Sequence, residues 1–350
     1  MVGHGVNLGG IERHVVALSA ALRGAGHQVA FAGPLDGWLG RAMAAEGLEC
    51  QHLPMRGMYD YRSAWKLRRF ARTWRADILH GHAMRGTRYA LMAKTARMPV
   101  VATAHSTNAS SRLRHDHPII TVSDAVREFL IGKGFPAEHI VSVYLGVGDL
   151  GLAAAPSPAG IGADRPLTLG MLSRLEPVKG HDIALEAVHL LQNDLPLRLV
   201  IIGPDNTDWA RQMKAKTIEL GLQDRVEFKG EASDLRGVFD GIDLMLAPSR
   251  REALSLSLIE AGAAGRPSIG ARIGGIPEVI EDGRSGLLVP PEDPPALAEA
   301  IQRLGRDDAL RQRMGQAARE VYEARFTEEV MVRRTEAIYE QAIRNRQARG

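Results

Sequence analysis

Two glutamates eight residues apart flank a run that alternates serine and leucine, in REALSLSLIE. The strand-like LMLAP ends near Pro248, so we expect Glu252 in a loop and Glu260 about two turns along a short helix. Carboxylates accept pairs of sugar hydroxyls, and amides at a helix start bind phosphate. Four residues would present those amides: Ala253, Leu254, Ser255 and Leu256. The segment predicts a sugar and phosphate site, unless Glu252 only caps the helix and Glu260 is exposed.

A second candidate is a pair of cations. The strand-like residues 167–172, LTLGML, precede a loop with Arg174 and Lys179, and a helix starts after Gly180. Arginine offers a fork of donors, lysine offers a point charge, and free backbone amides add more, so the loop predicts a pyrophosphate site. The alternative is two solvated basic side chains in an ordinary loop.

Strand-like and helical segments alternate along the chain, which is typical of parallel sheets covered by helices. We predict an α/β fold with two Rossmann-like, doubly wound domains, residues 1–150 and 167–320. Residues 151–166 are rich in Ala, Gly and Pro and would form the hinge. Residues 321–350 are helical and would return to the first domain. Only MVGHG precedes the glycine turn of VNLGG, so we expect that the central first strand is truncated or misassigned.

Composition and charge narrow the class of protein. With 350 residues, 45% of them hydrophobic, the chain can form two domains that each have a core. It lacks a signal-peptide pattern and any apolar run near the ~18 residues of a membrane helix, which predicts a cytoplasmic location. The single cysteine, Cys50, excludes an internal disulfide framework. The first 150 residues carry 18 Lys and Arg against 11 Asp and Glu, so this half should face an anionic partner.

Residues 56–75 are strongly basic, with seven Arg or Lys and only Asp60 against them. Five aromatic residues are interleaved: Tyr59, Tyr61, Trp65, Phe70 and Trp74. This pattern suits an interfacial helix on an anionic membrane, which would place the protein on the inner membrane face. The alternative is a surface helix whose apolar side packs on the sheet. Nothing in the stretch is typical of nucleic-acid recognition.

Together the two candidate segments are more specific than either alone. Arg174 and Lys179, followed about seventy residues later by the glutamate pair, resemble the motif of the retaining family 4 glycosyltransferases of the GT-B type. The similarity extends to other stretches: GGIERHVVALSAALRGAGHQV, DILHGH, VVATAH, ITVSDAVREFLIGKGF and GGIPEVIEDGRSGLLVPPEDPPALAEAI. It covers nearly the whole chain and implies a GT-B fold, in which two Rossmann-like domains face each other across a cleft.

The resemblance also implies a role for each candidate residue. Arg174 and Lys179 would neutralise the departing diphosphate. Glu252 would hold hydroxyls of the donor sugar, and Glu260 would hold those of the ribose. Further implied contacts are Gly9 and Gly10 at the phosphates or the sugar, His105 near the reacting sugar, Gly203, Lys229, Gly230 and Glu231 at the base, and His82, for which a structural role is the alternative.

The chain departs from the family pattern at two places. The family commonly reads Glu-Gly-Phe-Gly where this chain has Glu252 followed by Ala253, Leu254 and Ser255. Loss of both glycines predicts a narrower choice of backbone angles and a more crowded sugar pocket. In YLGVGDL, the family often has Asn-Gly-Val-Asp, so two polar residues are replaced, although Asp149 is close by.

The sequence therefore predicts a retaining hexosyltransferase. The donor would be a UDP- or GDP-sugar, and the acceptor a glycan or lipid-linked molecule of cell-envelope polysaccharide, lipopolysaccharide or glycolipid synthesis. The nucleotide sugar is a co-substrate, and neither a cofactor nor a metal is expected, since Arg174, Lys179 and helix dipoles replace the cation. Two alternatives remain: a nucleotide-sugar epimerase or hydrolase of the same architecture, and a non-catalytic member that binds a partner enzyme.

Overall fold

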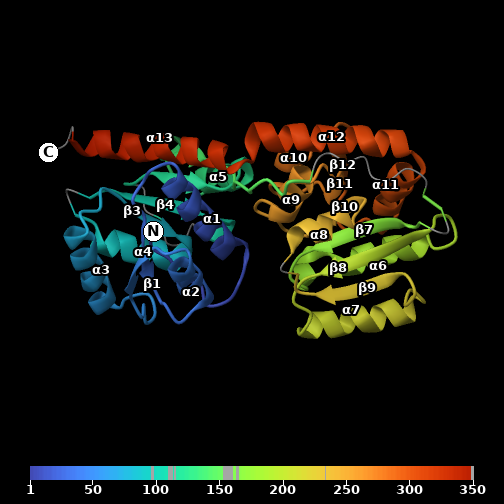
Figure 1. Ribbon diagram of the computed structural model, residues 1–350, viewed down its shortest axis with the longest axis horizontal. Helices are drawn as coiled ribbons and strands as arrows, with labels where there is room; N and C mark the ends of the chain where they lie inside the picture. Colours follow the sequence, from blue (N-terminus) through green and yellow to red (C-terminus); the bar gives the residue numbers. More distant parts are fainter. Residues whose placement is uncertain are drawn as a thin grey trace. The chain divides into compact units, whose positions relative to one another are not determined.

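The computed structural model divides into two compact units (Figure 1). It describes residues 1–95, 98–108, 113, 116–152, 161–162, 165–232 and 234–347. The first unit comprises Met1–Gly146 and Phe326–Gly350, and the second comprises Val147–Arg325. The chain thus leaves the first unit at Gly146, before the predicted hinge of residues 151–166. Within that hinge, residues 153–160 and 163–164 lie outside the described part of the chain.

The first unit contains parallel strands covered by helices. Its strands are β1 (Ala30–Gly33), β2 (Glu49–His52), β3 (Leu79–His82), β4 (Val100–Ala104), β5 (Ile119–Thr121) and β6 (Ile140–Ser142). Its helices are α1 (Gly10–Gly24), α2 (Trp38–Ala45), α3 (Tyr61–Thr73), α4 (Ala83–Ala93), α5 (Asp124–Gly132), the 3-10 turn η2 (Ala137–His139) and α13 (Glu328–Gln347). One parallel run is β1-β2 and the other is β3-β4-β5-β6.

Residues 1–3 lie where the sequence led us to expect a central first strand. Val2 forms parallel bridges to Ala32 in β1 and to Gly81 in β3. Its N–H donates to the carbonyl of His80 at 2.8 Å, and its carbonyl accepts from the N–H of His82 at 2.9 Å. A single bridged residue therefore joins the two runs, and the inner edges of β1 and β3 are paired at this point.

The C-terminal helix α13 packs within the first unit. Its Met331 and Ile338 share one apolar core with Leu18 of α1 and Val101 of β4. Burial of such side chains stabilises a fold by roughly 1.5–3 kcal/mol each. The division between the units falls after Arg325, a few residues beyond the boundary expected at residue 320.

The second unit is a six-stranded parallel sheet in the order β12-β11-β10-β7-β8-β9. Its strands are β7 (Leu167–Leu172), β8 (Leu197–Ile202), β9 (Val226–Gly230), β10 (Leu244–Ala247), β11 (Ser268–Ala271) and β12 (Gly286–Val289). Its helices are η3 (Pro177–Lys179), α6 (His181–Leu190), α7 (Asp208–Glu219), α8 (Leu235–Asp240), α9 (Leu256–Ala263), α10 (Ile276–Val279), α11 (Pro294–Arg306) and α12 (Asp308–Arg325). This is the Rossmann order, and the direction of winding reverses between β7 and β10, where ligands bind in such sheets.

Candidate active site

The loops after β7 and β10 meet at this switch point. Gly180 is the N-cap residue of α6 and has the left-handed conformation, with φ +70°. A Cβ atom at Gly180 would lie 2.0 Å from the carbonyl oxygen of Pro248, so any side chain there would force the two loops apart. The turn η3 ends at Lys179, directly before this contact. The β7 loop therefore delivers Lys179 to the loop that carries Glu252.

Lys179 and Glu252 form a close ion pair. The Nζ atom of Lys179 donates to Oε2 of Glu252 at 2.6 Å, and the two side chains are 21% and 13% exposed. At such partial burial each charge depends on its partner, because little water is available to replace it. A ligand that competes for both groups must offer an anion to Lys179 and hydrogen-bond donors to Glu252. A sugar diphosphate has both.

Arg174 lies on the same loop but outside this pair. Its guanidinium contacts Glu176 at 2.8 Å, and the side chain is 58% exposed. The structure thus brings Lys179 and Glu252 together and leaves Arg174 largely exposed, and the role of Arg174 at the diphosphate stays a prediction.

Arg250 holds the two loops together, a role that sequence reasoning missed. Its guanidinium makes two parallel bonds to the carboxylate of Asp182 at 2.9 and 2.8 Å, and another to the carbonyl of Pro177 at 2.8 Å. Its backbone N–H donates to the carbonyl of Val178 at 2.8 Å. All these acceptors flank Lys179. The signal was in the sequence: an aspartate directly after Lys-Gly-His, and an arginine two residues before Glu252.

The glycines that this site requires are on the loop after β11. A Cβ at Gly274 would lie 1.9 Å from the carbonyl oxygen of Glu252, and one at Gly275 would lie 2.1 Å from that of Ala253. Among the described non-glycine residues with positive φ, neither Ala253 nor Ser255 appears. Neither position therefore needs the left-handed angles that favour glycine, and the expected crowding of the sugar pocket stays a prediction.

We expect Ala253→Gly to destabilise the protein by about 0.5–1 kcal/mol, since glycine gains freedom mainly in the unfolded chain. Urea denaturation measures this change. Gly274→Ala is the matched comparison and should cost more, because its φ of +51° and the carbonyl of Glu252 both oppose a side chain. A more stable Ala253→Gly variant would show that the loop is strained.

Glu260 lies in α9 and is fully buried. Burial excludes the alternative of an exposed Glu260, because a carboxylate is rarely placed in an interior without a specific partner. The helix begins at Leu256 after Ser255, and no side chain caps its first amides. The predicted amide segment thus coincides with the helix start, where backbone N–H groups are available to an anion.

Gly203 and Gly230 meet at the ends of β8 and β9. The N–H of Gly203 donates to the carbonyl of Gly230 at 2.8 Å. A Cβ at Gly203 would lie 1.9 Å from the carbonyl oxygen of Ser173, so this glycine also touches the β7 loop. Lys229 and Glu231 are exposed on either side. The predicted base-binding residues therefore border the loop that carries Arg174 and Lys179.

His181 follows Gly180 and is completely buried, with Nε2 3.1 Å from the Ser173 hydroxyl. Burial lowers its pKa to about 4. In the unfolded chain a histidine has a pKa of about 6.5. Between that pH and the lower pKa of the folded state, only the unfolded state binds the proton, so acidification favours unfolding. We expect the free energy of unfolding to fall by about 3 kcal/mol between pH 6.5 and 4, relative to His181→Gln. Denaturation across pH measures this difference, and parallel curves for both proteins would contradict it.

In the first unit, the glycine loop opens α1. Gly9 is the N-cap residue, with extended angles of φ −160° and ψ 178°, and the helix begins at Gly10. These angles do not require glycine. The nearest atom to a Cβ at Gly9 would be Oε2 of Glu12, at 2.8 Å, which is the mobile end of a side chain. Neither backbone strain nor a rigid neighbour therefore requires glycine here, and the contact of Gly9 with a donor stays a prediction.

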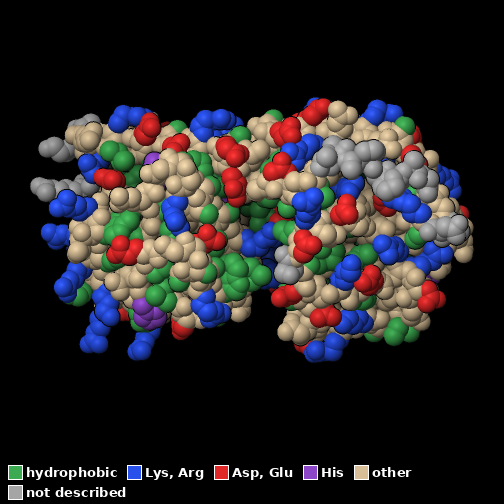
Figure 2. Space-filling model, viewed as in Figure 1, with side chains coloured by type: hydrophobic (Ala, Val, Ile, Leu, Met, Phe, Trp, Pro, Cys, Tyr) green, Lys and Arg blue, Asp and Glu red, His purple; other side chains and the backbone are tan. Residues whose placement is uncertain are grey.

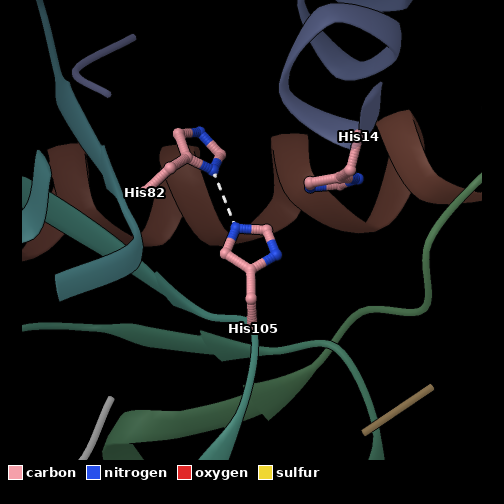
Figure 3. Close-up of side chains that lie close together, drawn as sticks. All are labelled: His14, His82 and His105. Carbon is pink, nitrogen blue, oxygen red and sulfur yellow. Dashed lines mark hydrogen bonds between the residues drawn. The ribbon is translucent and has the colours of Figure 1, made fainter. Parts of the chain in front are cut away.

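His105 follows β4 and belongs to a cluster of buried histidines (Figure 3). Its Nε2 atom is 3.3 Å from Nδ1 of His82, at the end of β3. His14, on α1, turns toward the same space, with its ring centroid 5.2 Å from that of His105. Burial lowers the pKa of His14 to about 4 and holds the pKa values of His82 and His105 well below their usual range. These imidazoles are therefore uncharged at neutral pH. Sequence reasoning missed His14.

The basic segment forms α3, and its aromatic residues divide into two groups. Tyr59, Tyr61 and Trp65 are 54%, 70% and 61% exposed. Phe70 and Trp74 are half-buried, and the indole of Trp74 donates to Glu49. Figure 2 shows Lys and Arg side chains gathered over the part of the molecule where α3 lies in Figure 1. In the part of the chain that the structure describes, no helix has the length and apolar character needed to cross a membrane.

Two family models match the chain and leave little of it uncovered. Residues 159–321 match glycosyl transferases group 1, and residues 8–149 match glycosyltransferase family 4. The chain belongs to these glycosyltransferases. The predicted family is therefore confirmed.

Two curated relatives illustrate the similarity within this family. D-inositol 3-phosphate glycosyltransferase of Streptomyces bingchenggensis is 30% identical over 297 residues, which are 78% of this chain and 63% of the relative. N-acetyl-alpha-D-glucosaminyl L-malate synthase of Bacillus anthracis is 28% identical over 309 residues, 82% of this chain and 80% of the relative. The chain thus spans less than two thirds of the first relative's length.

Solved glycosyltransferase structures share the fold. A glycosyltransferase from Rickettsia africae has a TM-score of 0.85 and 20% identity, with 98% of each chain covered. HepE of Anabaena, solved with UDP and glucose, has a TM-score of 0.79 and 20% identity, with 96% of this chain and 97% of that chain covered. The predicted GT-B type with two Rossmann-like domains is confirmed.

Proposed function

We propose that this glycosyltransferase moves a hexose from a nucleotide diphosphate sugar to a glycan or lipid-linked acceptor, with retention of configuration and without a metal at the diphosphate. The observation that carries the proposal is the Lys179–Glu252 pair at the switch point of the second sheet. In the proposal, Lys179 is the cation for the leaving diphosphate, and the adjacent Glu252 is the carboxylate for the sugar hydroxyls. The UDP and glucose bound to the structural neighbour HepE support a UDP-sugar as the first donor to test.

Donor binding and transfer can be tested separately. A panel of UDP- and GDP-sugars at about 100 times the dissociation constant should stabilise the protein by ~2.7 kcal/mol, seen as a thermal shift. The stabilising donor, radiolabelled, should then transfer sugar to an acceptor in the presence of EDTA. Donor consumption without any acceptor would instead identify a hydrolase or epimerase. No stabilisation by any nucleotide sugar would contradict the proposal.

The proposed acceptor belongs to cell-envelope polysaccharide or glycolipid synthesis. The names of the two relatives give small anionic acceptors, D-inositol 3-phosphate and L-malate. The acceptor panel should therefore contain these two compounds beside lipid-linked sugars. Transfer to a lipid-linked sugar alone supports the proposal, and transfer only to a small anion would replace it.

We also propose that α3 attaches the protein to an anionic membrane. Five residues line a surface hollow of ≈ 460 Å³: Trp65, Arg68, Arg69, Arg72 and Thr73. The exposed indole suits the interface, and cations attract acidic headgroups by about 1 kcal/mol each. Arg68 bonds to the carbonyls of Met92 and Lys94 at the end of α4, so it should be left intact in any test.

We expect a triple change, Trp65→Ala with Arg69→Ala and Arg72→Ala, to abolish co-flotation with phosphatidylglycerol vesicles. The reason is the loss of both the interfacial anchor and two charges. Arg333→Ala with Arg334→Ala, on the exposed face of α13, is the charge control and should float like the wild type. Equal flotation of the wild type with phosphatidylcholine vesicles would contradict an electrostatic attachment.

A further inference from the structure

Three buried histidines converge in the first unit from different elements, namely α1, the end of β3 and the loop after β4. One nitrogen from each of His14, His82 and His105 can be chosen so that all three lie within 4.8 Å of one another. Their ring centroids are 5.2, 5.6 and 5.9 Å apart. Figure 3 shows the rings turned toward a common space.

These separations match those of a metal bound by three imidazoles. With Zn–N bonds of about 2.0–2.1 Å in tetrahedral geometry, ligand nitrogens lie roughly 3.3 Å apart and ring centroids roughly 5 Å apart. The His82 and His105 nitrogens are already 3.3 Å apart. The other nitrogen separations are at most 4.8 Å, so a movement of the His14 ring by up to about 1.5 Å would complete the set.

The hydrogen bonding of the cluster is incomplete. Among the described residues, Nδ1 of His14 and Nε2 of His82 are buried and have no hydrogen-bond partner. Buried polar atoms in proteins are nearly always bonded, so such atoms call for an explanation. A metal ion bound to Nδ1 of His14 would remove the need for a hydrogen bond at that atom, whereas His82 faces His105 through its other nitrogen, Nδ1.

A neighbouring histidine holds the cluster in place. His80 stacks on His82, with ring centroids 4.1 Å apart. Its Nδ1 contacts the Tyr339 hydroxyl and its Nε2 contacts the Thr103 hydroxyl, both at 2.6 Å. Because both ring nitrogens of His80 are engaged, it acts as a fixed wall behind His82, and the ligand ring can turn only a little.

We propose that His14, His82 and His105 bind a divalent first-row transition metal, with Zn²⁺ as the preferred ion. Imidazole ligands suit Zn²⁺, and three of them leave a fourth position for water or an anion. The described ligand group holds three neutral imidazoles and no carboxylate, so the charge of the ion favours an anion at the fourth position. The proposed site is built from residues of the first unit, whereas Lys179 and Glu252 belong to the second, and it does not rest on the proposed transfer reaction.

The test measures metal binding directly on the full chain, produced without a histidine tag. After dialysis against a chelator, Co²⁺ should give the visible absorption of a tetrahedral site, and calorimetry with Zn²⁺ should give one ion per chain. His14→Ala, His82→Ala and His105→Ala should each weaken Zn²⁺ binding by about tenfold or more. His181→Ala, at a buried histidine of the other unit, is the control and should bind like the wild type.

Folding of each variant is checked by circular dichroism, so that a lost site is distinguished from a lost fold. Absence of the tetrahedral Co²⁺ spectrum in the wild type would overturn the proposal whether or not the variants fold. Binding that all three variants keep would overturn it as well, because the ion would then lie elsewhere. Loss of Zn²⁺ binding in folded His14→Ala supports it most directly, since His14 has no other assigned role.

Discussion

Replacement of Lys179 by alanine should lower kcat/KM for sugar transfer by about 10²- to 10³-fold, the loss typical of removing one preorganised group that stabilises transition-state charge. Lys179 is the cation nearest to Glu252, at 2.6 Å, and only a fifth of its side chain is exposed. Its removal also leaves the Glu252 carboxylate without its partner. Steady-state kinetics with the donor identified by thermal shift measures the effect.

Arg174→Ala provides the comparison on the same loop. Since its side chain is 58% exposed and contacts only Glu176 in the ion pairs described, its loss should cost less than that of Lys179. A double change of Lys179 and Glu252 should be far less damaging than the sum of the single changes, because the two act as one unit. Additive losses, or a larger loss for Arg174→Ala, would contradict the assignment of the pair.

The sequence predicted the fold because its signals are local. Alternating strand and helix patterns, with glycines at helix ends, suffice for two parallel α/β domains. The first strand could not be assessed in this way. Val2 contributes a single bridged residue, and its place is decided by hydrogen bonds to β1 and β3 rather than by any pattern of its own.

The two halves of the candidate site were linked in the sequence by the resemblance to family 4 glycosyltransferases. The structure adds the physical reason that Lys179 and Glu252 meet, because both come after neighbouring strands at the same edge of the sheet. The role of Gly274 could not be inferred, since it depends on the approach of the β11 loop to the carbonyl of Glu252. The same limit applies to Ala253, whose carbonyl is approached by Gly275 of the β11 loop.

The histidine cluster shows a further limit. His82 and His105 end two adjacent strands, which is a readable signal. His14 lies within an amphipathic helix, where it occupies an ordinary core-facing position. Only the packing of α1 brings it to the other two rings, so spacing along the chain gave no metal-binding motif.

Arg250→Ala should reduce kcat/KM by about 10- to 100-fold without removing any group that would touch the substrate, because small misplacements of a reacting group cost this much. The guanidinium ties Asp182 and the carbonyl of Pro177 to the loop of Glu252, and it also contacts Glu292 at 2.8 Å. Burial opposes ionisation of Asp182, yet the bonds from Arg250 hold its pKa below the usual range. Loss of this partly exposed pair should also cost about 1–3 kcal/mol of stability.

The neighbouring Arg251 separates positioning from charge. Arg251 is the next residue along the chain, and its side chain is exposed. Arg251→Ala removes one positive charge, as Arg250→Ala does, and should leave both stability and kinetics near wild type. Arg250→Lys should recover part of the stability but little of the activity, because lysine keeps the charge and lacks the bidentate contact to Asp182.

The possible outcomes separate these roles. If Arg250→Ala lowers the melting temperature, and kcat/KM measured well below that temperature is unchanged, Arg250 stabilises the fold only. If Arg251→Ala is equally impaired, the effect comes from net positive charge near the donor. A third outcome is a fall in kcat/KM that Arg250→Ala shows, that Arg251→Ala does not show, and that is too large to result from partial unfolding. It would mean that Lys179 is effective only while Arg250 connects the two loops.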